Sequence, residues 1–85
     1  MNKSILVIED EEDIRDILTH YIKKEGYVVK EAMDGETGIR LVERESIDLI
    51  ILDLMLPDMS GFDVCKKISS NHKIPILCSL PSVIS

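Results

Sequence analysis

The sequence predicts a single doubly wound α/β domain, in which helices cover both faces of a parallel sheet. The chain has 85 residues, which suffice for one small domain. Short, continuous apolar runs alternate with amphipathic segments of helical periodicity, in the order βαβαβαβ. Strands that are apolar on both faces are typical of parallel sheets, and parallel strands joined by helices make right-handed crossovers. These two observations together predict the fold class.

Four segments are expected to be strands. The first, residues 4–8, reads Ser-Ile-Leu-Val-Ile, which is short, rich in β-branched residues and almost entirely apolar. Residues 27–31 form the second expected strand. Residues 48–53 form the third, which is apolar between its terminal aspartates. A fourth strand is expected to begin within residues 74–77, where one proline interrupts an apolar run.

Three amphipathic segments between these strands are expected to be helices. The first follows an acidic run over residues 9–13 and stops at Gly26, after two lysines. The negative charges at its start and the positive charges at its end both interact favourably with the helix dipole. The second spans residues 35–44, and the third spans residues 61–69. The apolar side chains that we expect to face inward are Ile14, Ile17, Ile39, Val42, Phe62, Cys65 and Ile68.

Composition argues against several classes of function. The net charge is -6 and aromatic residues make up 4% of the chain, so it is a poor candidate for direct binding of nucleic acid. No apolar run approaches the length of a membrane span, and the N-terminus lacks the long apolar region of a signal peptide. Cys65 and Cys78 form neither a CxxC nor a zinc pattern. We therefore expect a cytoplasmic protein with reduced thiols that does not bind a membrane.

Acidic residues follow two of the expected strands. Glu9 and Asp10 come directly after the first strand, and Asp53 ends the third. If these strands are neighbours, three carboxylates converge where ligands bind in open α/β sheets. Such a cluster needs a counter-charge, and Mg²⁺ suits a site of carboxylates and water better than zinc or copper does. The simpler alternatives are an acidic helix cap for Glu9 and Asp10, and a solvated strand end for Asp53.

Two stretches resemble the receiver domains of response regulators in two-component signal transduction. They are residues 5–11, Ile-Leu-Val-Ile-Glu-Asp-Glu, and residues 48–62, which contain Asp-x-x-x-Pro and a glycine. Ile14-Arg15 and residues 26–29 also lie where that family has them, and the resemblance covers residues 3–77. It is nearest to the OmpR/PhoB-like subfamily, whose receivers precede a winged-helix DNA-binding domain. The implied fold is flavodoxin-like.

The resemblance assigns roles to these residues. Asp53 is expected to be the phosphoacceptor, which receives a phosphoryl group from a histidine of a sensor kinase. Asp10 is expected to bind Mg²⁺ directly, together with Asp53, and Glu9 through metal-bound water. The backbone carbonyl of Met55 is expected to complete the protein ligands. The first helix is expected to contact the kinase. Such a domain is not an enzyme, and at most it would phosphorylate itself slowly from small phosphodonors.

The chain departs from the family pattern after the fourth strand. A complete receiver has five βα units, whereas here residues 1–77 match an incomplete receiver and residues 78–85 form an atypical tail. Leu80 stands where the family has a Thr or Ser, and the lysine after the fifth strand has no counterpart. Codons can be assigned to the tail that restore the family's Thr-Ala after a shift of one base, so we hypothesise a single-base deletion. Phosphorylation of Asp53 is therefore expected to be slow, with switching impaired or absent.

The missing fifth strand also predicts self-association. In the family's strand order, 2-1-3-4-5, the fourth strand is interior, so without a fifth its edge offers unpaired N–H and C=O groups. Apolar residues of the first, third and fourth strands are then expected to face water. The alternative function is consequently an inert, oligomerising remnant with no phosphotransfer activity.

Two further classes of function fit the sequence less well. A phosphatase of the haloacid dehalogenase type carries a second aspartate two residues after its nucleophile, and Met55 occupies that position here. A flavin or nucleotide carrier needs a phosphate-binding loop after the first strand, rich in Gly, Ser or Thr. The acidic run over residues 9–13 would repel phosphate instead.

Overall fold

The structure is a computed structural model, and it describes residues 2–79 of the chain. The strands are β1 (Ser4–Ile8), β2 (Val28–Ala32), β3 (Leu49–Asp53) and β4 (Ile76–Ser79), and the helices are α1 (Glu12–Lys24), α2 (Gly35–Arg44) and α3 (Gly61–Asn71). The predicted alternation of strands and helices is confirmed. Within this part of the chain, every helix is too short or too polar to cross a membrane.

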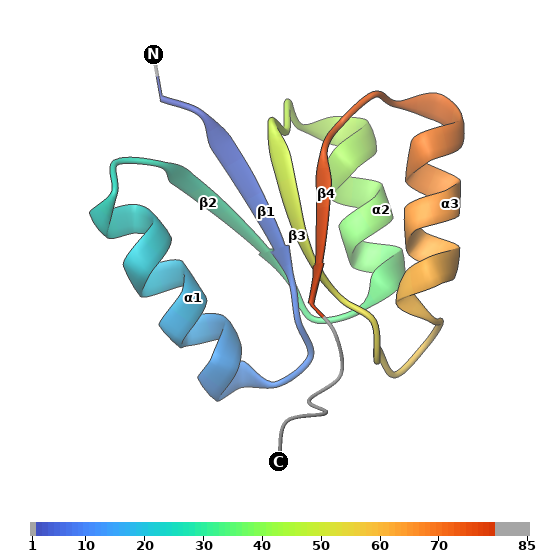
Figure 1. Ribbon diagram of the computed structural model, residues 1–85, viewed down its shortest axis with the longest axis horizontal. Coiled ribbons are helices and arrows are strands. Elements are labelled where there is room, and N and C mark those ends of the chain that lie inside the picture. Colours follow the sequence, from blue (N-terminus) through green and yellow to red (C-terminus); the bar gives the residue numbers. More distant parts are fainter. Residues whose placement is uncertain (1, 80–85) are drawn as a thin grey trace.

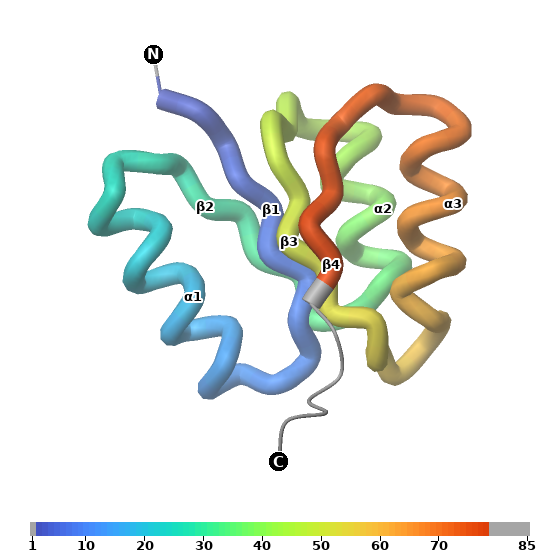
Figure 2. Tube along the Cα trace, viewed as in Figure 1, coloured from blue at the N-terminus to red at the C-terminus, as the bar shows by residue number. Residues whose placement is uncertain are grey.

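The four strands form one parallel sheet in the order β2-β1-β3-β4. Figure 1 shows α1 on one face of the sheet, with α2 and α3 side by side on the other. Figure 2 traces the chain through the crossovers that join the strands. The predicted doubly wound fold is therefore confirmed for the described residues, and its strand order is that of the flavodoxin-like fold.

The main hydrophobic core lies between the sheet and the helices α2 and α3. The register pairs Leu6 of β1 with Ile50 of β3, and Ile8 with Leu52, so all four side chains point to the same face. The buried residues of this core are Leu6, Ile8, Ala32, Val42, Ile47, Ile50, Leu52, Val64 and Ile68. Each fully buried Leu, Ile or Val contributes about 1.5–3 kcal/mol, so this layer supplies most of the hydrophobic stabilisation.

The opposite face of the sheet is covered unevenly. Val7 of β1 is fully buried, its partner Ile51 of β3 is half-buried, and Leu77 of β4 is 60% exposed. A groove of about 450 Å³ opens on this face, lined by Ile8, Glu9, Ile14, Leu18, Ile51, Asp53, Leu77 and Cys78. The predicted exposure of apolar strand residues is thus confirmed for β4. It is wrong for β1, because α1 packs over that strand.

Most of the predicted boundaries agree with the structure. β1 and α2 have the predicted bounds, β2 lies one residue later, and α3 continues to Asn71. β4 begins at Ile76, after Pro75, and it includes Cys78 and Ser79. The first two residues of the expected tail therefore belong to this strand. The expectation concerning Leu80 lies outside the described residues.

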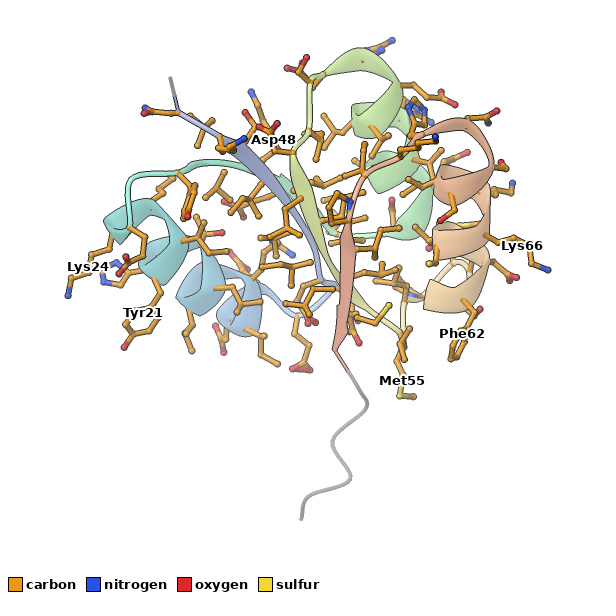
Figure 3. The ribbon with its side chains drawn as sticks, turned by 45° about the horizontal axis from the view of Figure 1, so that its top comes forward. Tyr21, Lys24, Asp48, Met55, Phe62 and Lys66 are labelled. Atoms are coloured by element: carbon orange, nitrogen blue, oxygen red, sulfur yellow. The ribbon has the colours of Figure 1, made fainter. Side chains whose placement is uncertain are left out.

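The prediction that Ile14 and Ile17 pack inward is wrong. Their side chains are 43% and 56% exposed, and the buried residue of α1 is Thr19. α1 packs mainly on β1 and β2, so within residues 2–79 no layer covers the side of the helix that carries Ile14 and Ile17. Tyr21 is also exposed, and Figure 3 shows its side chain directed away from the sheet.

The prediction that Phe62 faces the core is wrong as well. Its side chain is 70% exposed, and Figure 3 shows it directed away from the body of the protein. The buried residues of α3 are Gly61, Val64 and Ile68, which recur at helical spacing, and Phe62 falls outside the face that they define. The predicted positions of Cys65 and Ile68 on the inner face are confirmed.

Candidate functional site

The register of the two central strands brings two acidic segments to one edge of the sheet. Ile8, the last residue of β1, pairs with Leu52 of β3, so Glu9 and Asp53 are the next residues on neighbouring strands. Asp10 follows Glu9 on the way into α1. Because β1 and β3 run in the same direction, their acidic ends open on the same side of the sheet.

The carboxylates of Glu9, Asp10 and Asp53 form a cluster there. One carboxylate oxygen from each residue lies within 4.8 Å of the others. Glu9 is only 7% exposed, Asp53 is half-buried, and Asp10 is exposed to solvent. The cluster therefore extends from a buried carboxylate to one at the surface, where a cation can reach it from solvent. These are the three carboxylates that the sequence predicted to converge.

The surroundings of Glu9 raise its pKa to about 7. Burial is the largest cause, because it disfavours the charged form of a carboxyl group. A hydrogen bond from the amide of Glu11 to Oε2 of Glu9, 3.1 Å long, opposes this rise in pKa, and the negative charge of Asp53 adds to it. A proton and a metal cation would consequently compete for this carboxylate near neutral pH.

The loop between β3 and α3 is held against the end of β3. The amide of Met55 donates a hydrogen bond to Oδ1 of Asp53 over 3.1 Å, and the amide of Gly61 donates one to the carbonyl of Leu54 over 2.9 Å. Met55 and Ser60 form an isolated antiparallel bridge that closes the loop at its base. The main chain of Met55 thus borders the carboxylate cluster. The role of its carbonyl as a metal ligand stays a prediction.

Asp58 in this loop is a residue that the sequence reasoning missed. Its Oδ1 accepts a hydrogen bond from the amide of Gly35 over 2.9 Å, and its Oδ2 accepts one from the amide of Glu36 over 3.0 Å. Asp58 therefore caps the N-terminus of α2 from another part of the chain. The two amides, that of Gly35 foremost, hold the pKa of the Asp58 carboxyl below its usual range. These partners lie 23 and 22 residues away, so no local spacing could have indicated them.

Arg15 is a second residue whose contacts the sequence does not indicate. Its Nη1 donates a hydrogen bond to the main-chain carbonyl of Glu9 over 2.8 Å, and its Nε donates one to Oε1 of Glu31 over 3.1 Å. The Arg15 side chain is only 14% exposed. It therefore joins the start of α1 to the ends of β1 and β2.

Comparison with known families agrees with this geometry. The sequence profile described as "Response regulator receiver domain" matches residues 5–79, which include the three clustered carboxylates and all the described strands and helices except Ser4, the first residue of β1. The match ends at Ser79, the last residue of β4.

Curated relatives are similar over most of the chain. Regulatory protein VanRc from Enterococcus gallinarum is 40% identical over 77 residues, which are 91% of this chain and 33% of that protein. The uncharacterized transcriptional regulatory protein YrkP from Bacillus subtilis (strain 168) is 45% identical over 73 residues, 86% of this chain and 31% of that protein. The chain thus spans about a third of the length of these relatives.

Solved structures share the fold and much of the sequence. Response regulator protein TrrA from Thermotoga maritima, solved in complex with Mg(2+)-BeF, is 34% identical with a TM-score of 0.84, over 92% of this chain and 70% of that one. A chain from the complex of histidine kinase ThkA with response regulator protein TrrA is 34% identical with a TM-score of 0.83, over 98% of this chain and 74% of that one. Together with the profile match, these likenesses show that this chain belongs to the family of response-regulator receiver domains.

Proposed function

We propose that this chain is a Mg²⁺-dependent phosphoacceptor of a two-component phosphorelay, in which Asp53 receives the phosphoryl group. The observation that carries the proposal is the convergence of the Glu9, Asp10 and Asp53 carboxylates within 4.8 Å, in a chain of the receiver family. Receiver domains accept phosphoryl groups and are not enzymes in the ordinary sense. We therefore propose no catalytic turnover beyond residual autophosphorylation from small phosphodonors.

In this proposal Asp53 is the nucleophile. An oxygen of its carboxylate attacks the phosphorus of a phosphohistidine, the P–N bond breaks, the imidazole leaves, and an acyl phosphate forms on Asp53. The hydrogen bond from the Met55 amide restrains Oδ1.

The residues of the cluster suit Mg²⁺. Within residues 2–79, the group of metal-binding side chains consists of three carboxylates, with neither histidine nor cysteine, and hard oxygen donors favour a hard cation. In this proposal Asp10 and Asp53 bind the ion, Glu9 holds it through water, and the carbonyl of Met55 completes the protein ligands. Bound Mg²⁺ would neutralise charge on the transferred phosphoryl group. The Mg(2+)-BeF complex of TrrA supports this assignment.

We further propose that phosphorylation of Asp53 is slow and is not propagated as a conformational switch. In the family, a Thr or Ser after the fourth strand and a later Lys contact the phosphoryl group, and the sequence has Leu80 at the first of these positions. Losing one preorganised donor typically costs roughly 3–4 kcal/mol of transition-state stabilisation. Leucine at this position, which offers no hydroxyl group, should therefore slow transfer.

The proposed partner is the phosphorylated histidine of a sensor kinase in the cytoplasm. The solved complex of histidine kinase ThkA with TrrA supports this class of partner. Self-association is the second proposed interaction, since the described residues pair β4 with β3 only and leave Leu77 60% exposed. An inert, self-associating chain is the alternative that the first experiment must separate from a phosphoacceptor.

Intact-mass spectrometry after incubation with acetyl phosphate tests the proposal. We expect a slow mass gain of one phosphoryl group that requires Mg²⁺ and is lost in Asp53→Asn. A separate Mg²⁺ titration should give weaker binding for Asp10→Asn and for Asp53→Asn than for the unmodified chain. No mass gain at any time, with normal folding, would favour the inert alternative. Rapid and complete phosphorylation would instead contradict the proposed impairment.

A further inference from the structure

We infer that Arg15 is a positioning residue for the carboxylate cluster: it fixes the Glu9–Asp10 peptide in place through the main-chain carbonyl of Glu9. The inference rests on the proposed Mg²⁺ site. It assigns a role to a residue outside the set of proposed metal ligands.

Arg15 bonds the main chain at the point where the hydrogen bonds between β1 and β2 end. The amide of Glu9 donates to the carbonyl of Ala32 on β2 over 3.0 Å, and this is the last bond between the two strands. The carbonyl of Glu9 then points beyond the paired part of β2. Nη1 of Arg15 supplies its donor at 2.8 Å. Both polar groups of the Glu9 main chain are thereby held, one by β2 and one by α1.

Holding this carbonyl also places the next residue. A peptide group is planar, so fixing the carbonyl oxygen of Glu9 fixes the plane that contains the amide and the α-carbon of Asp10. Asp10 is exposed, and packing alone does not restrain it. The position of its carboxylate relative to Glu9 and Asp53 consequently depends on the orientation of this peptide.

Helix stability does not explain an arginine at this position. Arg15 lies in the first turn of α1, and its own amide bonds the carbonyl of Glu11 over 2.9 Å. A cation near a helix N-terminus is unfavourable for the helix dipole. Yet the Arg15 side chain is largely buried and turned back toward β1 and β2, with Nε on Glu31 at 3.1 Å. The guanidinium group donates in two directions at once, which a lysine ammonium on a flexible stem does far less well.

The test compares variants of Arg15 with a matched loss of charge elsewhere. Arg40 forms an exposed ion pair with Glu36 at 3.5 Å on α2, which lies on the other face of the sheet from α1 (Figure 1), so Arg40→Gln removes the same charge without removing a contact to Glu9. Mg²⁺ affinity is measured by titration of the full chain with the metal alone. Urea unfolding of each variant in the absence of metal reports folding stability separately.

We expect Arg15→Gln and Arg15→Lys to weaken Mg²⁺ binding by about 10-fold or more, the usual effect of removing a group that orients a metal ligand. Arg40→Gln should bind Mg²⁺ like the unmodified chain. Arg15→Lys keeps the charge, so its loss of affinity would exclude a purely Coulombic effect of Arg15.

Three results would overturn the inference or its basis. Folded Arg15→Gln that binds Mg²⁺ as tightly as the unmodified chain would show that Arg15 only joins α1 to β2. Equal gains of Mg²⁺ affinity in Arg15→Gln and Arg40→Gln, with Arg15→Lys unaffected, would show that net charge alone matters, because removing a cation strengthens the binding of Mg²⁺. If the unmodified chain itself fails to bind Mg²⁺, the proposed metal site fails, and the positioning inference fails with it.

Discussion

A β-carbon on residue 61 would lie 2.8 Å from the carbonyl oxygen of Asp53 and 2.5 Å from the α-carbon of Leu54. Only glycine lets the first turn of α3 approach the end of β3 this closely. Both obstructing atoms belong to the main chain, which cannot move aside as a flexible side chain can. The packing of Gly61 thus sets the position of the strand end that presents Asp53.

Gly61→Ala should therefore destabilise the fold and disturb the carboxylate cluster. Overpacking of this kind typically costs about 1–3 kcal/mol. Urea unfolding should show that loss, and Mg²⁺ affinity should fall in the folded variant. Ser69→Ala, at an exposed position in the same helix, is the control and should change little. Unchanged stability and metal affinity in Gly61→Ala would mean that the loop relaxes without cost.

Metal-free stability should depend on pH through Glu9. Its pKa is about 7 in the folded protein against an ordinary value of 4.5, so the folded state binds the extra proton between these values. A group with a raised pKa favours folding fully below its unfolded value, and this contribution is lost as pH rises through the folded value. The free energy of unfolding should accordingly fall from about pH 4.5 to above pH 7.

Glu9→Gln should remove this part of the pH dependence. Urea unfolding at several pH values, without divalent metal, measures it for both proteins. Mg²⁺ affinity should change in the opposite direction, rising with pH as Glu9 loses its proton. Parallel stability profiles for Glu9→Gln and the unmodified chain would contradict the prediction.

Asp58→Ala should lower stability, because the amides of Gly35 and Glu36 would lose their acceptor at the start of α2. The pKa of Asp58 is lowered from 3.8, so its stabilising contribution is present above that value and is lost as pH falls below it. Thermal unfolding at neutral and at acidic pH should show a difference between the two proteins that shrinks in acid. Asp58→Asn should lose less, since its amide oxygen can still accept one of the two bonds. A difference that does not depend on pH would exclude the charged form of Asp58 as the cap.

Self-association should depend on the exposed face of β4. Leu77→Lys places a charge on this face and should shift the chain toward monomer in light scattering over a dilution series. Phe62→Lys changes an equally apolar side chain that is 70% exposed on α3 and serves as the control. An unmodified chain that stays a folded monomer at micromolar concentration would contradict the prediction. If Leu77→Lys and Phe62→Lys reduce self-association equally, the interface does not lie on the exposed face of β4.

The sequence predicted those parts of the fold that depend on local patterns. The boundaries of Ser4–Ile8 follow from its continuous apolar residues, and those of Gly35–Arg44 from its helical spacing. The convergence of Glu9, Asp10 and Asp53 followed from one further assumption, that the strands carrying these residues are neighbours.

The predictions of buried side chains were wrong where burial depends on which element packs against a helix. Ile14 and Phe62 lie on apolar helices, but periodicity alone does not say which part of an apolar stripe meets the sheet. Asp58 and Arg15 were missed for a related reason. Asp58 accepts from main-chain amides far away in the sequence, and Arg15 donates to a main-chain carbonyl around a loop; every residue type has a carbonyl, and nearly every one an amide.

The pairing of Ile8 with Leu52 makes the site sensitive to chain length as well as to residue type. One residue inserted into β1 before Glu9 would advance the acidic pair by about 3.3 Å and turn alternate side chains to the opposite face. A conservative exchange within β1 would leave the carboxylates in place. Residues 72–75 connect α3 to β4 at the far end of the sheet, and the geometry of the cluster does not restrict the length of this connection. Related genes should therefore vary in length in such connections and keep the spacing within β1 and β3 constant.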